Sequence, residues 1–298
     1  MKLLNGTELA GYIKERQSRE LRGFKPSLAI IRDNDTPVIS KYVALKKQYG
    51  ADIGVEVTDH LVHTNQLEQT IKEANTDPTV TGIILQLPLL SPDQTNPLIN
   101  QIAPEKDVDG LSAKSHFTSA TALAIHHLLA GYNIDLGSTH LDEVQERSEQ
   151  RSETYSDIRR ASSGRSDAEI RQMRKPKIAI IGKGRLVGMP LTKMWQDSGY
   201  NITVFDSKSS LSNLNTFDLI VTATGHPNLI KPEMIGHGAI LVDAGTASES
   251  GRVIGDIDDS IRTRKDITIT PKIGGVGPMT ITMLFENLLI ATHCHSPA

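Results

Sequence analysis

Short apolar segments alternate with helix-like segments along most of this chain, and this alternation limits its fold more than any other feature. Apolar runs typical of buried strands stand at 27–32, 53–57 and 80–87. Helical segments at 38–50 and 65–75 separate them. Strands that alternate with helices predict βαβ units with a parallel sheet.

A second block of the same kind begins at Lys177, where Ile-Ala-Ile-Ile-Gly follows the lysine. Its later strands are expected at 202–205, 219–222 and 240–243. The last segment, 279–292, carries apolar residues at helical spacing and predicts a closing amphipathic helix. With 298 residues, the chain is too long for one ordinary core, so we expect two domains.

Composition narrows the class of protein. The net charge of −3 gives no electrostatic reason to expect nucleic acid or an acidic membrane as a partner. No apolar stretch approaches the roughly 18 residues of a membrane span, and the first residues lack the apolar run of a signal peptide. Cys294 is the only cysteine, which rules out an internal disulfide and fits a reducing compartment. We therefore expect a cytosolic protein.

One glycine-rich segment has the character of a nucleotide loop. Gly182-Lys183-Gly184-Arg185-Leu186-Val187-Gly188 follows an apolar strand and leads into a helical segment. Glycines there let backbone amides approach a pyrophosphate, whose charge the helix N-terminus stabilises. The pattern predicts a dinucleotide site, and a tight turn that needs glycine is the alternative.

Asp206 stands directly after the strand expected at 202–205. A carboxylate there can accept hydrogen bonds from the ribose hydroxyls of NAD, and it would repel the 2′-phosphate of NADP. Lys183, Arg185 and Lys208 could instead pair with that phosphate. A cap or turn role for Asp206 is equally open, so the residues alone do not choose between the two cofactors.

Tyr42 and Lys46 are four residues apart on a predicted helix and therefore share one face. Such a pair could bind an aromatic substrate and manage protons. The ordinary alternative is an exposed lysine beside a half-buried tyrosine. Short-chain dehydrogenases also carry Tyr-x-x-x-Lys, but after their nucleotide-binding glycines; here the pattern precedes them, which argues against that family.

Three more segments carry candidate residues. Gln86 ends the third strand of the first block, the edge at which open α/β sheets bind ligands. The loop 106–110 holds two carboxylates, and the loop 274–280 combines three glycines with a proline before the last helix. A solvated side chain, a turn and a plain loop are the respective alternatives. No His or Cys pair has the spacing of a metal site.

These segments occur in a specific order: 40–47, 86–89, 104–110, 182–190, 224–227, 238–245, 255–258 and 269–280. In that order they closely resemble one family, the bifunctional methylenetetrahydrofolate dehydrogenases/methenyltetrahydrofolate cyclohydrolases. The resemblance covers nearly the whole chain outside 138–175, a segment rich in charged residues and serine that we interpret as a solvated insertion.

The resemblance implies an α/β fold of two domains and a C-terminal helix that returns to the first domain. The N-terminal βαβ domain would be the folate-binding catalytic domain, formed by 1–118 and 279–298. The Rossmann-like NAD(P)-binding domain would be 119–278, including the insertion. The family also implies a homodimer, tetrahydrofolate derivatives as substrates, and NADP as cofactor, with NAD as the alternative because of Asp206.

Residue roles follow from the same resemblance. Lys46 would be the catalytic lysine, and Tyr42 would stack on folate. Gln86 would hydrogen-bond Lys46, and Asp109 would hold the pterin ring. The residues expected beside folate and nicotinamide are Gly274, Gly275 and Pro278. The residues expected to bind the cofactor are Gly182, Lys183, Gly184, Arg185, Val187, Gly188, Asp206, Ser207, Thr224 and Gly225.

The implied activity is oxidation of 5,10-methylenetetrahydrofolate to the methenyl form with NAD(P), then hydrolysis to 10-formyltetrahydrofolate. Two departures from the family touch the dinucleotide site: the usual Gly-Arg-Ser reads Gly182-Lys183-Gly184, and the usual histidine after the second strand reads Asp206. A folate-binding homologue with cyclohydrolase activity only, or without turnover, is therefore the alternative. Gln86 and the loop 106–110 disfavour another NAD(P)-dependent dehydrogenase.

Overall fold

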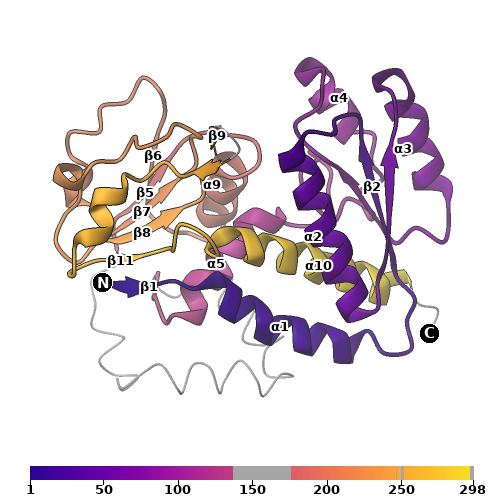
Figure 1. The fold of residues 1–298 in the computed structure, drawn as a ribbon, viewed down its shortest axis with the longest axis horizontal. Helices are drawn as coiled ribbons and strands as arrows, with labels where there is room; N and C mark the ends of the chain where they lie inside the picture. Colours follow the sequence, from indigo (N-terminus) through magenta and orange to yellow (C-terminus); the bar gives the residue numbers. More distant parts are fainter. Residues whose placement is uncertain (137–175, 246, 250–251, 296–298) are drawn as a thin grey trace. The chain divides into compact units, whose positions relative to one another are not determined.

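The computed structural model describes residues 1–136, 176–245, 247–249 and 252–295, so the insertion expected at 138–175 lies outside the described residues. Contacts divide the chain into two compact α/β units (Figure 1). We name them by their sheets. The six-stranded unit comprises Met1–Leu9 and Ala122–Met279, and the three-stranded unit comprises Ala10–Thr121 and Thr280–Ala298.

The sheet of the three-stranded unit has the order β3-β2-β4, and both strand pairs are parallel. Its strands are β2 (Ser27–Arg32), β3 (Glu56–Leu61) and β4 (Gly82–Leu85). The central strand β2 is buried at every residue but its first. Strands buried on both faces are typical of a parallel sheet covered by helices.

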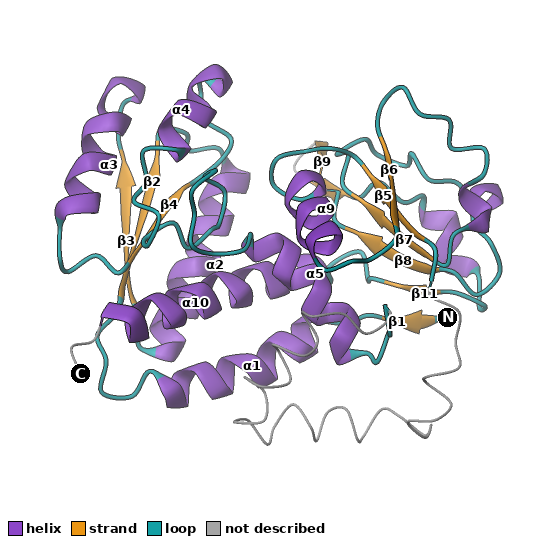
Figure 2. Cartoon of the chain, turned by 180° about the vertical axis from the view of Figure 1, so that it is seen from behind, coloured by secondary structure: helices purple, strands orange, loops and turns teal. Residues whose placement is uncertain are grey.

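Helices lie along this sheet (Figure 2), and side chains that alternate along the strands pack against them. On one face, β2 and β4 residues such as Ile31 and Leu85 form a core with α3 (Leu67–Thr76) and α4 (Thr95–Ile99). Two short 3-10 helices, η1 (Thr64–Gln66) and η2 (Pro92–Gln94), lead into α3 and α4. The helix α2 (Pro37–Ile53) connects β2 to β3.

The C-terminal helix α10 (Val276–His295) packs into the three-stranded unit along its later turns. Phe285, fully buried, stacks on Tyr49 with 4.9 Å between ring centroids. Asn287 Nδ2 donates to Val108 O (2.8 Å), and Gln17 Nε2, on α1 (Gly6–Glu20), donates to Thr282 O (3.1 Å). The expected return of this helix to the first domain is confirmed.

The six-stranded sheet has the order β1-β11-β8-β7-β5-β6 and is parallel throughout. The strands are β1 (Lys2–Leu3), β5 (Ile178–Ile181), β6 (Ile202–Phe205), β7 (Leu219–Thr222), β8 (Ile240–Asp243) and β11 (Thr268–Ile269). The helices α5 (Ala120–Gly131) and α9 (Gly188–Asp197) and the hairpin of β9 (Ala247–Glu249) and β10 (Arg252–Ile254) complete the regular elements named here.

The strand order reverses at β5. The chain runs from β5 to β6 on one side and then returns to β7 on the other. In open parallel sheets, ligands bind in the crevice outside the carboxyl ends of the strands at such a reversal. The segment that begins at Gly182 leaves β5 at this point, so the Rossmann-like prediction is confirmed and the glycine segment stands where a dinucleotide loop belongs.

Several predicted strands coincide with observed ones, but one does not. The strand expected at 53–57 is wrong, because α2 continues to Ile53 and β3 runs over Glu56–Leu61. β3 is an edge strand that includes Thr58, Asp59 and His60, so the apolar pattern was a poor guide to it.

The N-terminus also differs from the boundaries expected from sequence. β1 pairs with β11, which places Met1–Leu9 in the six-stranded unit rather than with 10–118. In the described part of the chain, no helix is both long and apolar enough to cross a membrane.

Candidate active site and nucleotide loop

Helix α2 presents Tyr42 and Lys46 from the three-stranded unit. Thr36 caps its N-terminus by accepting a hydrogen bond from Ile39 N (3.5 Å), and Pro37 occupies the first turn, where no backbone donor is needed. Gly54 ends the helix in the left-handed conformation, which glycine adopts without strain. The caps fix the helix, and both candidate side chains are half-buried on it.

Gln86 meets Lys46 at the end of β4. Lys46 Nζ donates to Gln86 Oε1 over 2.6 Å, while Gln86 Nε2 donates to Leu87 O (2.9 Å). Gln86 is only 9 % exposed, and its amide is thereby held with the carbonyl oxygen toward the lysine. The contact expected between these two side chains is therefore present.

Asp109 supplies a negative charge to the same site. Burial lowers the pKa of Lys46, and the charge of Asp109 partly opposes this effect. Burial also raises the pKa of Asp109 to about 6, against the influence of Lys46 and with a smaller contribution from Asp107. An amine whose charge is disfavoured beside a carboxyl group that titrates near neutrality can exchange protons with a bound substrate.

The other charged residues of the loop 106–110 have structural roles. Lys106 is 8 % exposed, and its Nζ donates to the carbonyl oxygens of Ala74 (3.1 Å) and Asp77 (2.7 Å). Asp107, fully buried, accepts from Ser112 N (2.8 Å). These contacts hold the loop in place, and Asp109 is the carboxylate of the loop whose charge acts on Lys46.

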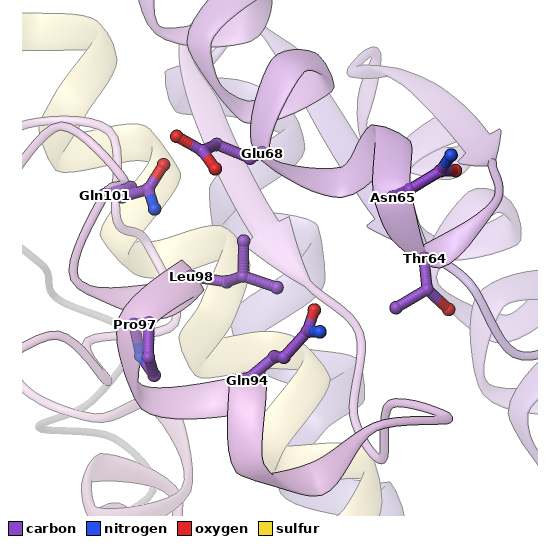
Figure 3. Close-up of a pocket in the computed structure, with 7 residues that line it drawn as sticks. All are labelled: Thr64, Asn65, Glu68, Gln94, Pro97, Leu98 and Gln101. Carbon is purple, nitrogen blue, oxygen red and sulfur yellow. The ribbon is translucent and has the colours of Figure 1, made fainter.

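A pocket of about 320 Å³ lies elsewhere in the three-stranded unit (Figure 3). Thr64, Glu68, Gln94 and Gln101 are among the residues that line it, and Figure 3 shows the last three around Leu98. None of the expected catalytic residues lines this pocket. Hollow volume alone therefore does not mark the site that the lysine, glutamine and carboxylate define.

In the six-stranded unit, the glycine loop is shaped by close backbone approaches. Gly182 has a φ of +108°, and a Cβ there would lie 2.4 Å from Ala223 O. A Cβ on Gly188 would lie 2.0 Å from Gly182 O. Side chains at these positions would fill the turn between β5, β7 and the first residue of α9. The cradle fits the pyrophosphate of a dinucleotide, which needs backbone amides at a helix N-terminus.

Asp206 is fully engaged at the carboxyl end of β6. Its Oδ2 accepts from Lys183 Nζ (2.9 Å), and its Oδ1 accepts from Lys208 N (3.1 Å) and Ser209 Oγ (2.9 Å). These three hydrogen bonds lower the pKa of Asp206 to about 2, and the one from Lys183 has the largest effect. Asp206 is thus an ionised turn residue, as one of the two interpretations of the sequence expected, and it is also the partner of a loop lysine.

The remaining residues expected at the cofactor occupy the same edge. Val187 precedes α9 and accepts from Leu191 N (2.9 Å), Arg185 is half-buried, and Ser207 is exposed. Thr224 and Gly225 follow β7, next to the carbonyl of Ala223 that crowds Gly182.

Asp256 supports the segment that follows β7, and the sequence analysis assigns it no role. It is fully buried, and its Oδ2 accepts from Thr224 N over 2.7 Å. Its own backbone N–H donates to Asp243 Oδ1 (3.1 Å) at the end of β8, and burial raises the pKa of Asp243. In the sequence, the segment 255–258 belongs to the family pattern, and no local signal in it indicates that Asp256 is buried.

The loop with Gly274 and Gly275 packs against the start of α1 in the six-stranded unit. Thr7 N donates to Gly274 O (3.0 Å), and a Cβ on Gly6 would lie 1.9 Å from Gly275 O. Pro278 lies in the first turn of α10, where proline is tolerated. Backbone packing thus accounts for part of the glycine content. In the described residues, no three His, Cys, Asp or Glu side chains gather as a metal ion would require.

Comparison with known families gives two matches. A model described as tetrahydrofolate dehydrogenase/cyclohydrolase, catalytic domain, matches residues 4–109. A model described as tetrahydrofolate dehydrogenase/cyclohydrolase, NAD(P)-binding domain, matches residues 167–296. Together they cover most of the chain.

Individual relatives match nearly the whole chain. The bifunctional protein FolD of Campylobacter jejuni is 32% identical in an alignment of 309 positions that covers 96% of each chain. A crystal structure of the Campylobacter jejuni methylenetetrahydrofolate dehydrogenase/cyclohydrolase superposes with a TM-score of 0.79 at 30% identity, over 99% of this chain and 100% of that one. The structure of a 5,10-methylenetetrahydrofolate dehydrogenase from the silkworm Bombyx mori superposes with a TM-score of 0.78 at 27% identity, over 99% of this chain and 98% of that one.

Proposed function

This chain belongs to the tetrahydrofolate dehydrogenase/cyclohydrolase family, and we propose that the residues described above carry both reactions of that family. The first oxidises 5,10-methylenetetrahydrofolate to the methenyl form. The second hydrolyses the methenyl form to 10-formyltetrahydrofolate. The contact between Lys46 Nζ and Gln86 Oε1, beside Asp109, is the observation that carries the proposal.

For the oxidation, the bound dinucleotide supplies the hydride acceptor. The work of the chain is positioning, because hydride transfer needs the two rings held in contact rather than acid–base help. The cradle of Gly182 and Gly188 would hold the pyrophosphate, and Asp256 would fix Thr224 beside it. In the three-stranded unit, Tyr42 would stack on folate and Asp109 would bind the pterin.

For the hydrolysis, water adds to the cationic methenyl carbon and gives up a proton. The bond from this carbon to one nitrogen then breaks: that nitrogen takes up a proton, the hydroxyl group loses its proton, and the formyl group stays on the other nitrogen. We assign the proton transfers to Lys46. Its burial lowers the pKa of the amine, so a fraction is neutral and can accept the proton from water. Gln86 would keep the amine oriented through the 2.6 Å hydrogen bond.

Asp109 would bind the pterin through charge. Its pKa of about 6 leaves most of the carboxyl groups ionised at neutral pH, so it can accept hydrogen bonds from the amino and ring N–H groups of a pterin. The same negative charge keeps Lys46 from losing its proton too readily. Asp109 thus links substrate binding to the protonation of the lysine.

NADP is the cofactor we propose, with NAD as a second acceptor. Lys183, Arg185 and Lys208 bring three positive charges to the loop and to the end of β6, against the one negative charge of Asp206. Lys183 already pairs with Asp206, which weakens the repulsion that this carboxylate would exert on a 2′-phosphate. The surplus of positive charge supports the phosphorylated cofactor.

Two further features follow from family membership and stay predictions: assembly as a homodimer, and location in the cytosol. The roles of Gly274, Gly275 and Pro278 beside folate and nicotinamide also stay predictions. The alternative of a folate-binding homologue without turnover is disfavoured, because binding alone would not require a lysine held by a buried glutamine.

One assay tests the proposal. The purified chain is given methylenetetrahydrofolate with NAD or with NADP, and methenyltetrahydrofolate without cofactor. We expect hydride transfer with both cofactors, faster with NADP, and hydrolysis of the methenyl form. Hydrolysis without hydride transfer to either cofactor would leave a cyclohydrolase only, and folate binding without either reaction would contradict the proposal.

A further inference from the structure

The segment 86–90, which carries Gln86 at its start, is tied to the residues that follow β2. Gln86 N donates to Ile31 O (2.9 Å), which continues the sheet. Beyond Gln86 the ties are made by side chains. Asn34 Nδ2 donates to Pro88 O (3.2 Å), and Leu90 N donates to Asp33 Oδ1 (3.1 Å).

Asp33 uses its other oxygen to hold a second element. Its Oδ2 accepts from Thr64 Oγ1 over 2.7 Å at the start of η1. Asp33 is only 7 % exposed, and both of its hydrogen bonds are partly buried. Hydrogen bonds to a carboxylate are stronger than those between neutral groups, so losing both of them would loosen the two segments that Asp33 holds.

We propose that Asp33 is a positioning residue for the hydrolysis at Lys46, which it serves by fixing the segment that presents Gln86. The proposal rests on the function proposed above. Its hydrogen bonds go to Leu90 and Thr64, so Asp33 acts on Lys46 only through the segment 86–90. If this segment is released at Leu90, the amide of Gln86 loses its fixed place opposite the amine.

The expected consequence is a loss of turnover rather than of substrate binding. A misplacement of about 1 Å between catalytic groups can cost on the order of 100-fold in rate. Tyr42 and Asp109, which we assign to folate binding, do not belong to this segment. Loosening it should therefore lower kcat for methenyltetrahydrofolate hydrolysis and leave KM nearly unchanged.

A double-mutant cycle tests the route of the effect. The variants are Asp33→Ala, Gln86→Ala and the double variant, in the full chain, with methenyltetrahydrofolate as substrate. We expect Asp33→Ala to lower kcat roughly 10- to 100-fold in the wild-type background. In the Gln86→Ala background it should cost less than about twofold, because the group that Asp33 positions is already gone.

Two controls separate positioning from general damage. Asp35→Ala removes a neighbouring carboxylate whose side chain is 56% exposed and bonded to Arg32 and Ser40, and we expect it to change kcat less than Asp33→Ala. Asp33→Asn keeps an amide oxygen for Leu90 N and an amide donor for Thr64 Oγ1, so it should restore most of the lost kcat.

The outcome of the double-mutant cycle supports or overturns the proposed role of Asp33. Equal losses from Asp33→Ala in both backgrounds would show a structural effect independent of Gln86 and would overturn the proposal. If Asp33→Ala does not fold, the same cycle with Asn34→Ala, which frees Pro88 O instead, takes its place with a smaller loss expected. A wild-type chain that does not hydrolyse methenyltetrahydrofolate would contradict the proposed function rather than this inference.

Discussion

The amine of Lys46 and the amide oxygen of Gln86 lie 2.6 Å apart, joining the middle of helix α2 to the end of strand β4. The two residues are far apart in sequence, and only the parallel order β3-β2-β4 brings their elements together. An ammonium group that donates to a fixed carbonyl keeps one orientation. The amine of Lys46 is therefore held in place, and its pKa is also lowered. This contact orients the amine, whereas burial and Asp109 set its pKa and therefore the pH behaviour expected of the enzyme.

The rate of hydrolysis should rise with pH as Lys46 loses its proton. Because burial lowers the pKa of this amine, the rise should come well below the usual 10.5 of lysine. Asp109 raises the pKa of Lys46, so Asp109→Asn removes that effect and should move the rise toward lower pH. The measurement is kcat for methenyltetrahydrofolate against pH, corrected for the reaction without enzyme. A midpoint that stays in place or moves toward higher pH would contradict this assignment.

Substrate affinity should depend on the protonation of Asp109. Its carboxyl group has a pKa of about 6, so it becomes neutral as the pH falls through that value. A neutral carboxyl group accepts hydrogen bonds from a pterin more weakly, and KM for methenyltetrahydrofolate should rise below pH 6. Asp109→Asn should raise KM at neutral pH and remove its dependence on pH in this range. The same pH dependence of KM in wild type and variant would argue that another group binds the pterin.

Substituting one or the other member of the Lys183–Asp206 ion pair should shift the preference between NADP and NAD in opposite directions. Asp206→Ser removes the negative charge and should raise kcat/KM for NADP relative to NAD by about tenfold, because the 2′-phosphate then meets less repulsion. Lys183→Met should lower that ratio. Steady-state kinetics with both cofactors at low salt measures it. Shifts in the same direction for both variants would rule out this account of selectivity.

Stability of the three-stranded unit should depend on the docking of α10. Phe285 is fully buried and stacks on Tyr49, so Phe285→Ala should cost about 3–5 kcal/mol of unfolding free energy. Ile290 lies on the same helix but is 46% exposed, and Ile290→Ala should cost no more than about 0.5 kcal/mol. Urea unfolding followed by fluorescence compares the two variants. Equal losses would mean that the helix is not held by this contact.

Much of the framework was predictable because strand and helix signals are local. The strands at 27–32, 202–205, 219–222 and 240–243 coincide with the observed ones, since each is a short run of mainly apolar residues in a covered parallel sheet. β1 could not be anticipated: it is a two-residue strand that exists only because β11, at the other end of the chain, pairs with it. The helices α1 and α5 also escaped detection, α5 because it is apolar on nearly all sides.

The site was predictable to the extent that its residues stand in recognisable segments. Lys46 and Gln86 were expected to meet, and their hydrogen bond confirms it. Long-range supports were not predictable, because nothing local indicates that Asp256 reaches Thr224 or that Asp33 reaches Leu90. The double use of Asp206, as turn residue and as partner of Lys183, likewise depends on two loops that only the fold brings together.

We assign the proton transfers of hydrolysis to Lys46, and a comparison of two neighbouring lysines tests this assignment most directly. Lys46→Met keeps the length of the side chain and removes the amine. Lys47→Met is the control, because the side chain of Lys47 is 47% exposed and its Nζ lies 3.5 Å from Asp59 Oδ2. We predict that Lys46→Met slows hydrolysis of methenyltetrahydrofolate by roughly 100- to 10,000-fold. Hydride transfer from methylenetetrahydrofolate should persist in the same variant, and Lys47→Met should leave both rates nearly unchanged. Hydrolysis by Lys46→Met at the wild-type rate would contradict the account.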